Sequence, residues 1–143
     1  MSPPRRAPRR RATPQRVAGT TAPRKSRKRA GVSPDELRRM VASLPETAEG
    51  PCYGTPGFRA RGKLFARLRE DGESLVVRVD PIERDLLLEA DPRCFYITDH
   101  YRDHPWVLVR LPVVEADVLA DMLDRAWRLA APRRLVEAHE RRH

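Results

Sequence analysis

Apolar and polar positions divide the chain into a polar N-terminal segment without periodicity and a longer segment with helical and strand periods. The first helical period consists of apolar residues three and four positions apart: Leu37, Met40, Val41 and Leu44. Ser33 and Glu36 have the spacing of a capping box, and Pro34 suits the first helical position. The sequence therefore predicts a helix that begins after Ser33 and ends at Pro45.

Alternation with a period of two follows over 58–71, around a turn at 61–63, and predicts a β-hairpin. One face of this hairpin is apolar and contains Phe58, Ala60, Leu64, Ala66 and Leu68. The other face contains Arg59, Arg61, Phe65, Arg67 and Arg69. A shift of one residue would bury the arginines, so this pattern sets the register of the hairpin.

The other predicted elements follow in short succession. Residues 46–57 are rich in glycine and proline and predict a loop or a short irregular strand around Cys52 and Tyr53. The remaining elements are a strand over 74–80, a helix over 81–90, strands over 94–98 and 106–111, a helix over 114–131 and a short helix over 133–140. The order α-β-β-β-α-β-β-α, before the short last helix, favours an α+β fold with a five-stranded antiparallel sheet and helices on one face.

Charge separates the same two segments. The chain of 143 residues has a net charge of +9. Residues 1–31 hold eleven of the 29 Lys and Arg and none of the 20 Asp and Glu, so residues 32–143 are close to neutral. The first segment has almost no large apolar side chain to bury and predicts a disordered basic tail, whereas 32–143 predicts one folded domain.

Several function classes have no support in the sequence. The chain has two cysteines and no long apolar run, which favours a reduced cytoplasmic protein without a membrane span. A possible metal site groups Cys94, Asp99, His100, Asp103 and His104. Pro105 argues against the helix that would aim both histidines at one ion, so we expect polar loop residues and no metal. Nucleophile signatures and phosphate-binding glycine loops are missing, so we expect neither an enzyme nor a cofactor.

An ordered set of motifs resembles the MmcQ/YjbR-like family of small bacterial proteins, over about 33–138. The motifs are Ser43-Leu44-Pro45, GFRARGKLFARL, Asp80-Pro81, FYITDHYRDHPWVLVRL and Ala126-Trp127-Arg128. The resemblance implies a fold similar to that of type III secretion chaperones. It also implies DNA binding, the function commonly given to the family, and no catalytic residues. The family pattern does not include the arginine-rich tail.

If the helices cover one face of the sheet, the other face gathers arginines and large apolar side chains. They are Arg59, Arg61, Arg67, Arg69, Arg78 and Arg110, with Phe65, Val76, Tyr96 and Trp106. Guanidinium groups bind phosphates in a bidentate manner and aromatic rings stack on bases, so this composition suits nucleic acid. The alternative is a solvated face on which the arginines pair with Asp80, Glu70 or Glu73.

The predicted nucleic-acid-binding residues lie in the tail and around the hairpin. They are Arg9, Arg10, Arg11, Arg24, Lys25, Arg27, Lys28 and Arg29, followed by Arg59, Arg61, Lys63, Arg67, Arg69 and Arg78. Phosphate contacts from the tail would give affinity without sequence specificity, unless the tail is an inert extension. DNA is the expected partner, and no small-molecule substrate is indicated. The alternative function is a protein-interaction or dimerisation module with an exposed patch of Phe65, Tyr96 and Trp106.

Overall fold

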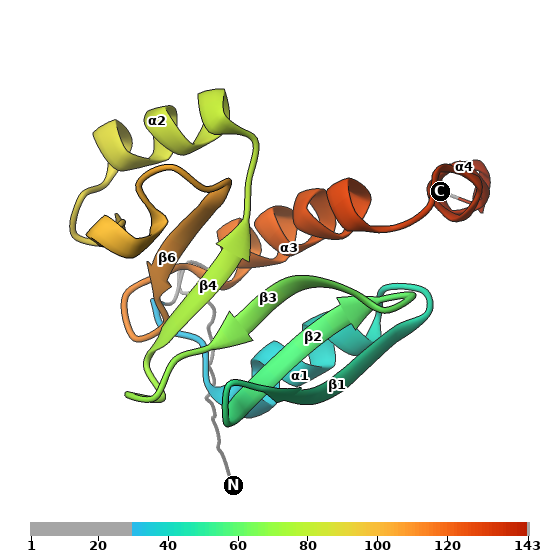
Figure 1. Ribbon diagram of the computed structural model, residues 1–143, viewed down its shortest axis with the longest axis horizontal. Coiled ribbons are helices and arrows are strands. Elements are labelled where there is room, and N and C mark those ends of the chain that lie inside the picture. The colour runs from blue at the N-terminus through green and yellow to red at the C-terminus, as the bar shows by residue number, and fades with distance from the viewer. Residues whose placement is uncertain (1–29, 143) are drawn as a thin grey trace, which may run out of the picture.

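The computed structural model describes residues 30–142, which form four α-helices and one six-stranded sheet (Figure 1). The helices are α1 (Pro34–Ala42), α2 (Pro81–Ala90), α3 (Ala116–Ala130) and α4 (Arg133–Arg142), with a 3-10 helix, η4, at Asp99–Tyr101. The strands are β1 (Thr47–Cys52), β2 (Thr55–Ala60), β3 (Lys63–Leu68), β4 (Ser74–Arg78), β5 (Phe95–Tyr96) and β6 (Trp106–Arg110).

The strands lie in the order β1-β2-β3-β4-β6-β5, and every neighbouring pair is antiparallel. The predicted α+β class is confirmed, but the predicted number of five strands is wrong because β1 adds a sixth. The sequence of β1, TAEGPC, has no apolar alternation and contains Gly50 and Pro51. It pairs only with β2 at the edge of the sheet, where a proline is tolerated. The strand predicted over 94–98 is shortened to two residues.

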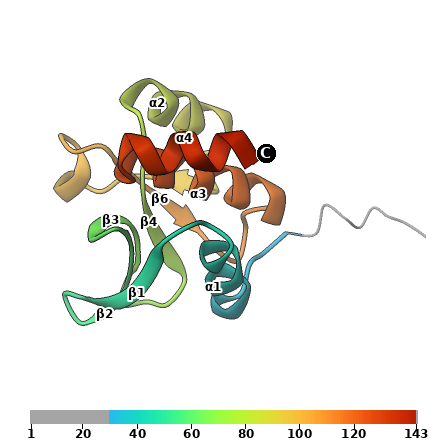
Figure 2. The same cartoon turned by 90° about the vertical axis from the view of Figure 1, so that its right-hand side faces the viewer.

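The core lies between one face of the sheet and helices α1 and α3, and α2 packs beside β5 (Figures 1 and 2). A row of register partners crosses this core-facing side, formed by Phe58, Ala66, Val77 and Val107. All of these residues are buried. From α3, the fully buried Trp127 donates its indole N–H to the carbonyl oxygen of Pro45 at 2.9 Å. The segment that follows α1 is thereby joined to α3.

The predicted starts of α1 and α2 are confirmed in atomic detail. The Ser33 hydroxyl accepts from the amide of Glu36 at 3.1 Å, and the Glu36 carboxylate accepts from the amide of Ser33 at 3.0 Å. At α2, Asp80 accepts from the amides of Ile82 and Glu83. These bonds satisfy N–H groups that have no partner inside the helix.

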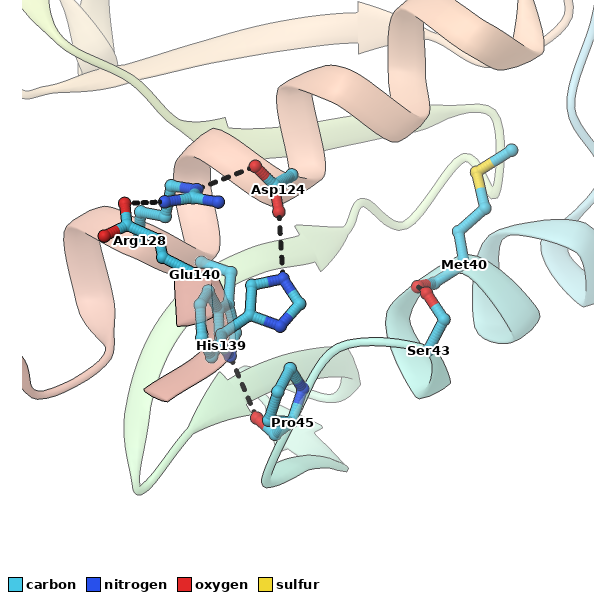
Figure 3. A network of polar contacts seen from close by, with 8 residues as sticks. Met40, Ser43, Pro45, Asp124, Arg128, His139 and Glu140 are labelled. Atoms are coloured by element: carbon cyan, nitrogen blue, oxygen red, sulfur yellow. Dashed lines mark hydrogen bonds and ion pairs between the residues drawn. The ribbon is translucent and has the colours of Figure 1, made fainter. Parts of the chain in front are cut away.

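The last helix, α4, is attached to α3 by polar contacts (Figure 3). Arg128 of α3 pairs with Asp124 one turn earlier and with Glu140 of α4. The second oxygen of Asp124 lies 3.7 Å from Nε2 of His139, whose ring packs edge-on against Trp127. The predicted short helix is therefore present, and its Glu140 and His139 contact side chains of α3.

A β-bulge between β2 and β3 changes which hairpin residues face the core. The register shifts at Phe58 and Arg59, so Phe58 lies opposite Ala66 but Arg59 lies opposite Leu64. Phe65 is fully buried in the core, whereas Leu64 is only partly buried on the opposite face. The predicted alternation is therefore wrong at these two positions, because strict alternation cannot accommodate the extra residue of a bulge.

The bulge predicts very different costs for two neighbouring truncations. Phe65→Ala should lower the free energy of unfolding by about 3–5 kcal/mol, as expected for an aromatic core residue. Leu64→Ala, which removes a partly exposed side chain, should cost only about 1 kcal/mol. Urea unfolding followed by circular dichroism measures both values. Equal costs, or a larger cost at Leu64, would contradict the assigned bulge.

Candidate functional site

The sheet face opposite the core, called the outer face here, carries a row of register partners formed by Gly57, Arg67, Val76, Leu108 and Tyr96. Arg59, Arg78, Trp106 and Arg110 lie beside this row. Val76 and Leu108 are buried although they point away from the core. Part of the outer face is therefore covered and is not a plain solvated surface.

The polar loop between β5 and β6, which includes η4, borders this face, because its residues His100, Tyr101 and His104 line a hollow together with Val76. Arg84 of α2 fixes this segment by donating to the carbonyl oxygens of Tyr101, His104, Trp106 and Arg102, at 3.0, 2.7, 3.2 and 2.9 Å. Its Nε is buried without a hydrogen-bond partner. Nothing in the local sequence around Arg84 indicates this role, because all four acceptors lie 17 to 22 residues away.

A two-part groove lies where this loop meets β3, β4 and the β1–β2 turn. Its apolar part has a volume of about 240 Å³ and is lined by Leu64, Val76, Trp106 and His104. Its basic part has a volume of about 430 Å³ and is lined by Arg69, Glu70 and Thr98. Tyr53, Arg67, His100 and Tyr101 line both parts. The groove therefore joins an aromatic and aliphatic end to an arginine end.

Tyr53 reaches the groove from a strained turn. It forms a two-residue turn with Gly54 between β1 and β2, and the φ angles of +54° and +83° are those of a type I′ turn. Such a φ costs a tyrosine about 1–3 kcal/mol. The residue is 88% exposed, and the Arg67 guanidinium lies 5.8 Å from the centroid of its ring. The sequence predicts a loop or a short irregular strand here, and its many glycines and prolines do not single out the Tyr-Gly pair as the turn.

The arginines of the outer face contact rings and neutral oxygens. Arg110 lies 4.0 Å from the ring centroid of Tyr96, and Arg78 lies 5.9 Å from that of Trp106. Arg67 donates to the Thr55 hydroxyl at 3.1 Å, and Arg59 donates to a carbonyl oxygen of β1 at 3.4 Å. Among residues 30–142, no carboxylate forms an ion pair with Arg59, Arg67, Arg78 or Arg110.

The structure brings together only some of the predicted binding residues. Arg59, Arg67 and Arg78 share the outer face, and Arg69 lines the basic part of the groove. Arg61 lies in the hairpin turn and pairs with Glu46, and Lys63 lies opposite the core residue Ala60. The eight predicted tail residues lie outside the described residues: Arg9, Arg10, Arg11, Arg24, Lys25, Arg27, Lys28 and Arg29. Phe65, predicted as an exposed contact, is buried.

The residues considered for a metal site are dispersed. The rings of His100 and His104 are 6.3 Å apart between centroids. Within 30–142, no group of three or more His, Cys, Asp and Glu side chains is placed to hold an ion. In the same part of the chain, no helix is long and apolar enough to cross a membrane.

Cys94 should be a poor nucleophile. Burial, with the nearby charge of Asp91, raises the pKa of its thiol to about 11, from 9.0. At pH 8 its thiolate fraction is therefore about 100-fold lower than in the unfolded chain, and only the thiolate reacts. Iodoacetamide labelling followed by mass spectrometry should modify Cys94 at least that much more slowly in the folded than in the urea-unfolded protein. Equal rates would contradict this environment.

Arg84 should hold the loop wall of the groove in place. In Arg84→Met, the four carbonyls no longer share a donor, so amide hydrogen exchange over 99–106 should rise by about tenfold or more. Exchange in α1 and α3 should stay unchanged. Arg39→Met, at an exposed position of α1, is the matched control and should leave the exchange of the loop and of both helices unchanged. If exchange in the loop stayed as slow as in the wild type, Arg84 would not be what fixes it.

Three comparisons place the chain among known proteins. The model of the family described as YjbR matches residues 42–129. Uncharacterized proteins of Mycobacterium tuberculosis and Mycobacterium bovis are 30% identical over 122 residues, which covers 73% of this chain and 92% of theirs. The crystal structure of the Deinococcus radiodurans protein DR2400, with a DUF419 domain, superposes with a TM-score of 0.61 at 25% identity, covering 68% of this chain and 77% of that one. The resemblance seen in the sequence is confirmed, and the chain belongs to the YjbR family.

Proposed function

We propose that this protein binds DNA in the cytoplasm through phosphate contacts that do not depend on base sequence. The supporting observation is the set of outer-face arginines, Arg59, Arg67, Arg78 and Arg110, which have no carboxylate partner within 30–142. Guanidinium groups that are not paired with a carboxylate can take phosphate oxygens in a bidentate manner.

The distribution of ion pairs strengthens this proposal. Carboxylates elsewhere pair with Arg38, Arg61, Arg102, Arg125 and Arg128. The domain is nearly neutral as a whole, but the ion-paired carboxylates of 30–142 are bound to arginines other than the four of the outer face. A nearly neutral domain can therefore present a positive surface, and phosphate contacts at such a surface release counterions.

Aromatic rings hold two of the outer-face arginines in place before any ligand binds. Arg110 over Tyr96 and Arg78 over Trp106 are held by cation–π contacts. A guanidinium already held in place loses less conformational entropy when it binds a phosphate. The tail, with eleven cations in residues 1–31, would add further phosphate contacts and supply most of the affinity.

A second candidate function is self-association or binding of a protein partner through α2. Ile82 and Leu86 lie one helical turn apart and are 74% and 63% exposed. This pair replaces the patch expected from the sequence, because Phe65 is buried. Light scattering distinguishes the two functions: a dimer that dissociates on Leu86→Asp, in a protein that does not bind DNA, would favour the second.

Charge placement can be tested with matched variants of the full chain. Arg59→Gln with Arg78→Gln should weaken binding to a labelled DNA by about tenfold and reduce the salt slope by about 0.9 for each phosphate that is no longer neutralised. Arg38→Gln with Arg102→Gln removes the same charge from ion-paired arginines and should leave both quantities nearly unchanged. Fluorescence anisotropy at several salt concentrations measures both.

The contribution of the tail is tested by deleting residues 1–29. The cut leaves the amide of Gly31 bonded to the carbonyl of Val114 at 2.8 Å, so the start of the domain is kept. DNA affinity should fall steeply and its salt dependence should flatten, since most of the phosphate contacts are expected from this segment. The proposal fails if the full chain shows no salt-sensitive anisotropy change.

A further inference from the structure

The two-part groove has the chemistry of a nucleotide in its two halves. Arg67 and the rings of Tyr53, His100 and Tyr101 line both halves. The apolar half adds Leu64, Val76 and Trp106, and the basic half adds Arg69. The apolar half, of about 240 Å³, is smaller than the roughly 300–1,000 Å³ of sites for drug-sized ligands and suits a single planar ring system. Tyr53 and Trp106 both line this half, and aromatic rings are side chains on which bases stack.

The position of the cations indicates a ligand that continues at both ends. Arg69 lines the basic half alone, and Arg67 lines both halves. Arg78 lies over the ring of Trp106, which lines the apolar half. A free mononucleotide has phosphate on one side of its base only, whereas a base within a strand has phosphates on both sides. Cations at both ends of the groove therefore favour a strand.

We infer that this groove holds one unpaired base of single-stranded DNA, with its phosphates on the arginines at either end. This inference rests on the proposed DNA binding and adds a preference for single strands. The bases of a duplex are stacked and paired, and a base must leave the stack to be enclosed by a protein pocket. His104, whose carbonyl oxygen accepts from Arg84, lines the apolar half together with Val76 and Leu64, so a base bound there would lie between the loop and the sheet and would have to leave its stack.

Glu70 is the one carboxylate that lines the basic half. It lies beside the same hollow as Arg67 and Arg69, so it would repel a phosphate bound there. The inference therefore also assigns Glu70 an opposing role. Glu70→Gln should bind single-stranded DNA more tightly, by about twofold to fivefold.

The decisive variant is Tyr53→Asn in the full chain. Asn-Gly is the preferred pair of a type I′ turn, so the fold should be kept while the ring is removed. Affinity for a labelled poly(dT) oligonucleotide should fall by about tenfold, and affinity for a hairpin duplex with as many phosphates should change less than about twofold. Leu129→Asn, which replaces a partly exposed apolar side chain of α3 that does not line the groove, is the charge-neutral control and should leave both affinities unchanged.

Tryptophan fluorescence supplies a second readout. Trp106 lines the groove, whereas Trp127 is buried in the core, so poly(dT) should quench only Trp106. Trp106→Phe should therefore abolish the quenching, and the duplex should cause little quenching in the wild type. Quenching that persists in Trp106→Phe would overturn the inference.

Three outcomes distinguish a failure of the single-strand inference from a failure of the proposed DNA binding. Equal affinity for poly(dT) and duplex, or an equal loss of both in Tyr53→Asn, overturns the single-strand inference and leaves phosphate binding intact. If thymidine monophosphate competes as effectively as poly(dT), the inference of a bound strand is overturned and the groove is assigned to a free nucleotide. Failure of both DNA probes to bind at low salt overturns the proposed function itself.

Discussion

The β-bulge between β2 and β3 is the constraint on which the other features depend. It sends Phe65 into the core and leaves the smaller Leu64 on the outer face, where Leu64 forms a wall of the groove. Close packing at Gly57 follows from the same geometry: a Cβ there would lie 2.8 Å from Cβ of Cys52 and 3.0 Å from Cδ1 of Leu64. Contacts this short would displace Cys52 or Leu64, so Leu64 keeps its place on the outer face only with glycine at position 57.

The second organising feature is the division of the arginines into two groups. One group is ion-paired, as in Arg61 with Glu46 and Arg38 with Glu49, and these pairs connect elements at the surface. Such exposed pairs add little stability individually. The other group lies on the outer face, with aromatic rings and neutral oxygens as its partners. Net charge, which averages the two groups, conceals this difference, and only the three-dimensional arrangement reveals it.

Local signals in the sequence were sufficient for most of the elements. Capping at Ser33 and Asp80 depends on residues within one turn, and apolar spacing marks α3, so these features were predictable. β1 was not, because an edge strand with a mostly exposed pattern needs no apolar alternation. That Phe65 and not Leu64 faces the core could be seen only from the register of β2 and β3. The groove could be seen only from the bonds of Arg84, which joins residues 17 to 22 positions away. Interactions between distant segments therefore account for the site that the sequence did not predict.

The two type I′ turns of the hairpins place a non-glycine residue, Tyr53 or Arg61, in the same strained conformation, so the reasons for keeping each side chain can be compared. Arg61 and Tyr53 both adopt a left-handed φ before a glycine, where asparagine or aspartate is preferred. For Arg61 the ion pair with Glu46 gives a structural reason to keep the side chain. Tyr53 has no ion pair of this kind: the residue is 88% exposed, and its ring contacts the Arg67 guanidinium beside the groove. A strained, exposed aromatic residue that does little for the core is typical of a binding position, because local preference is most often violated where function requires it.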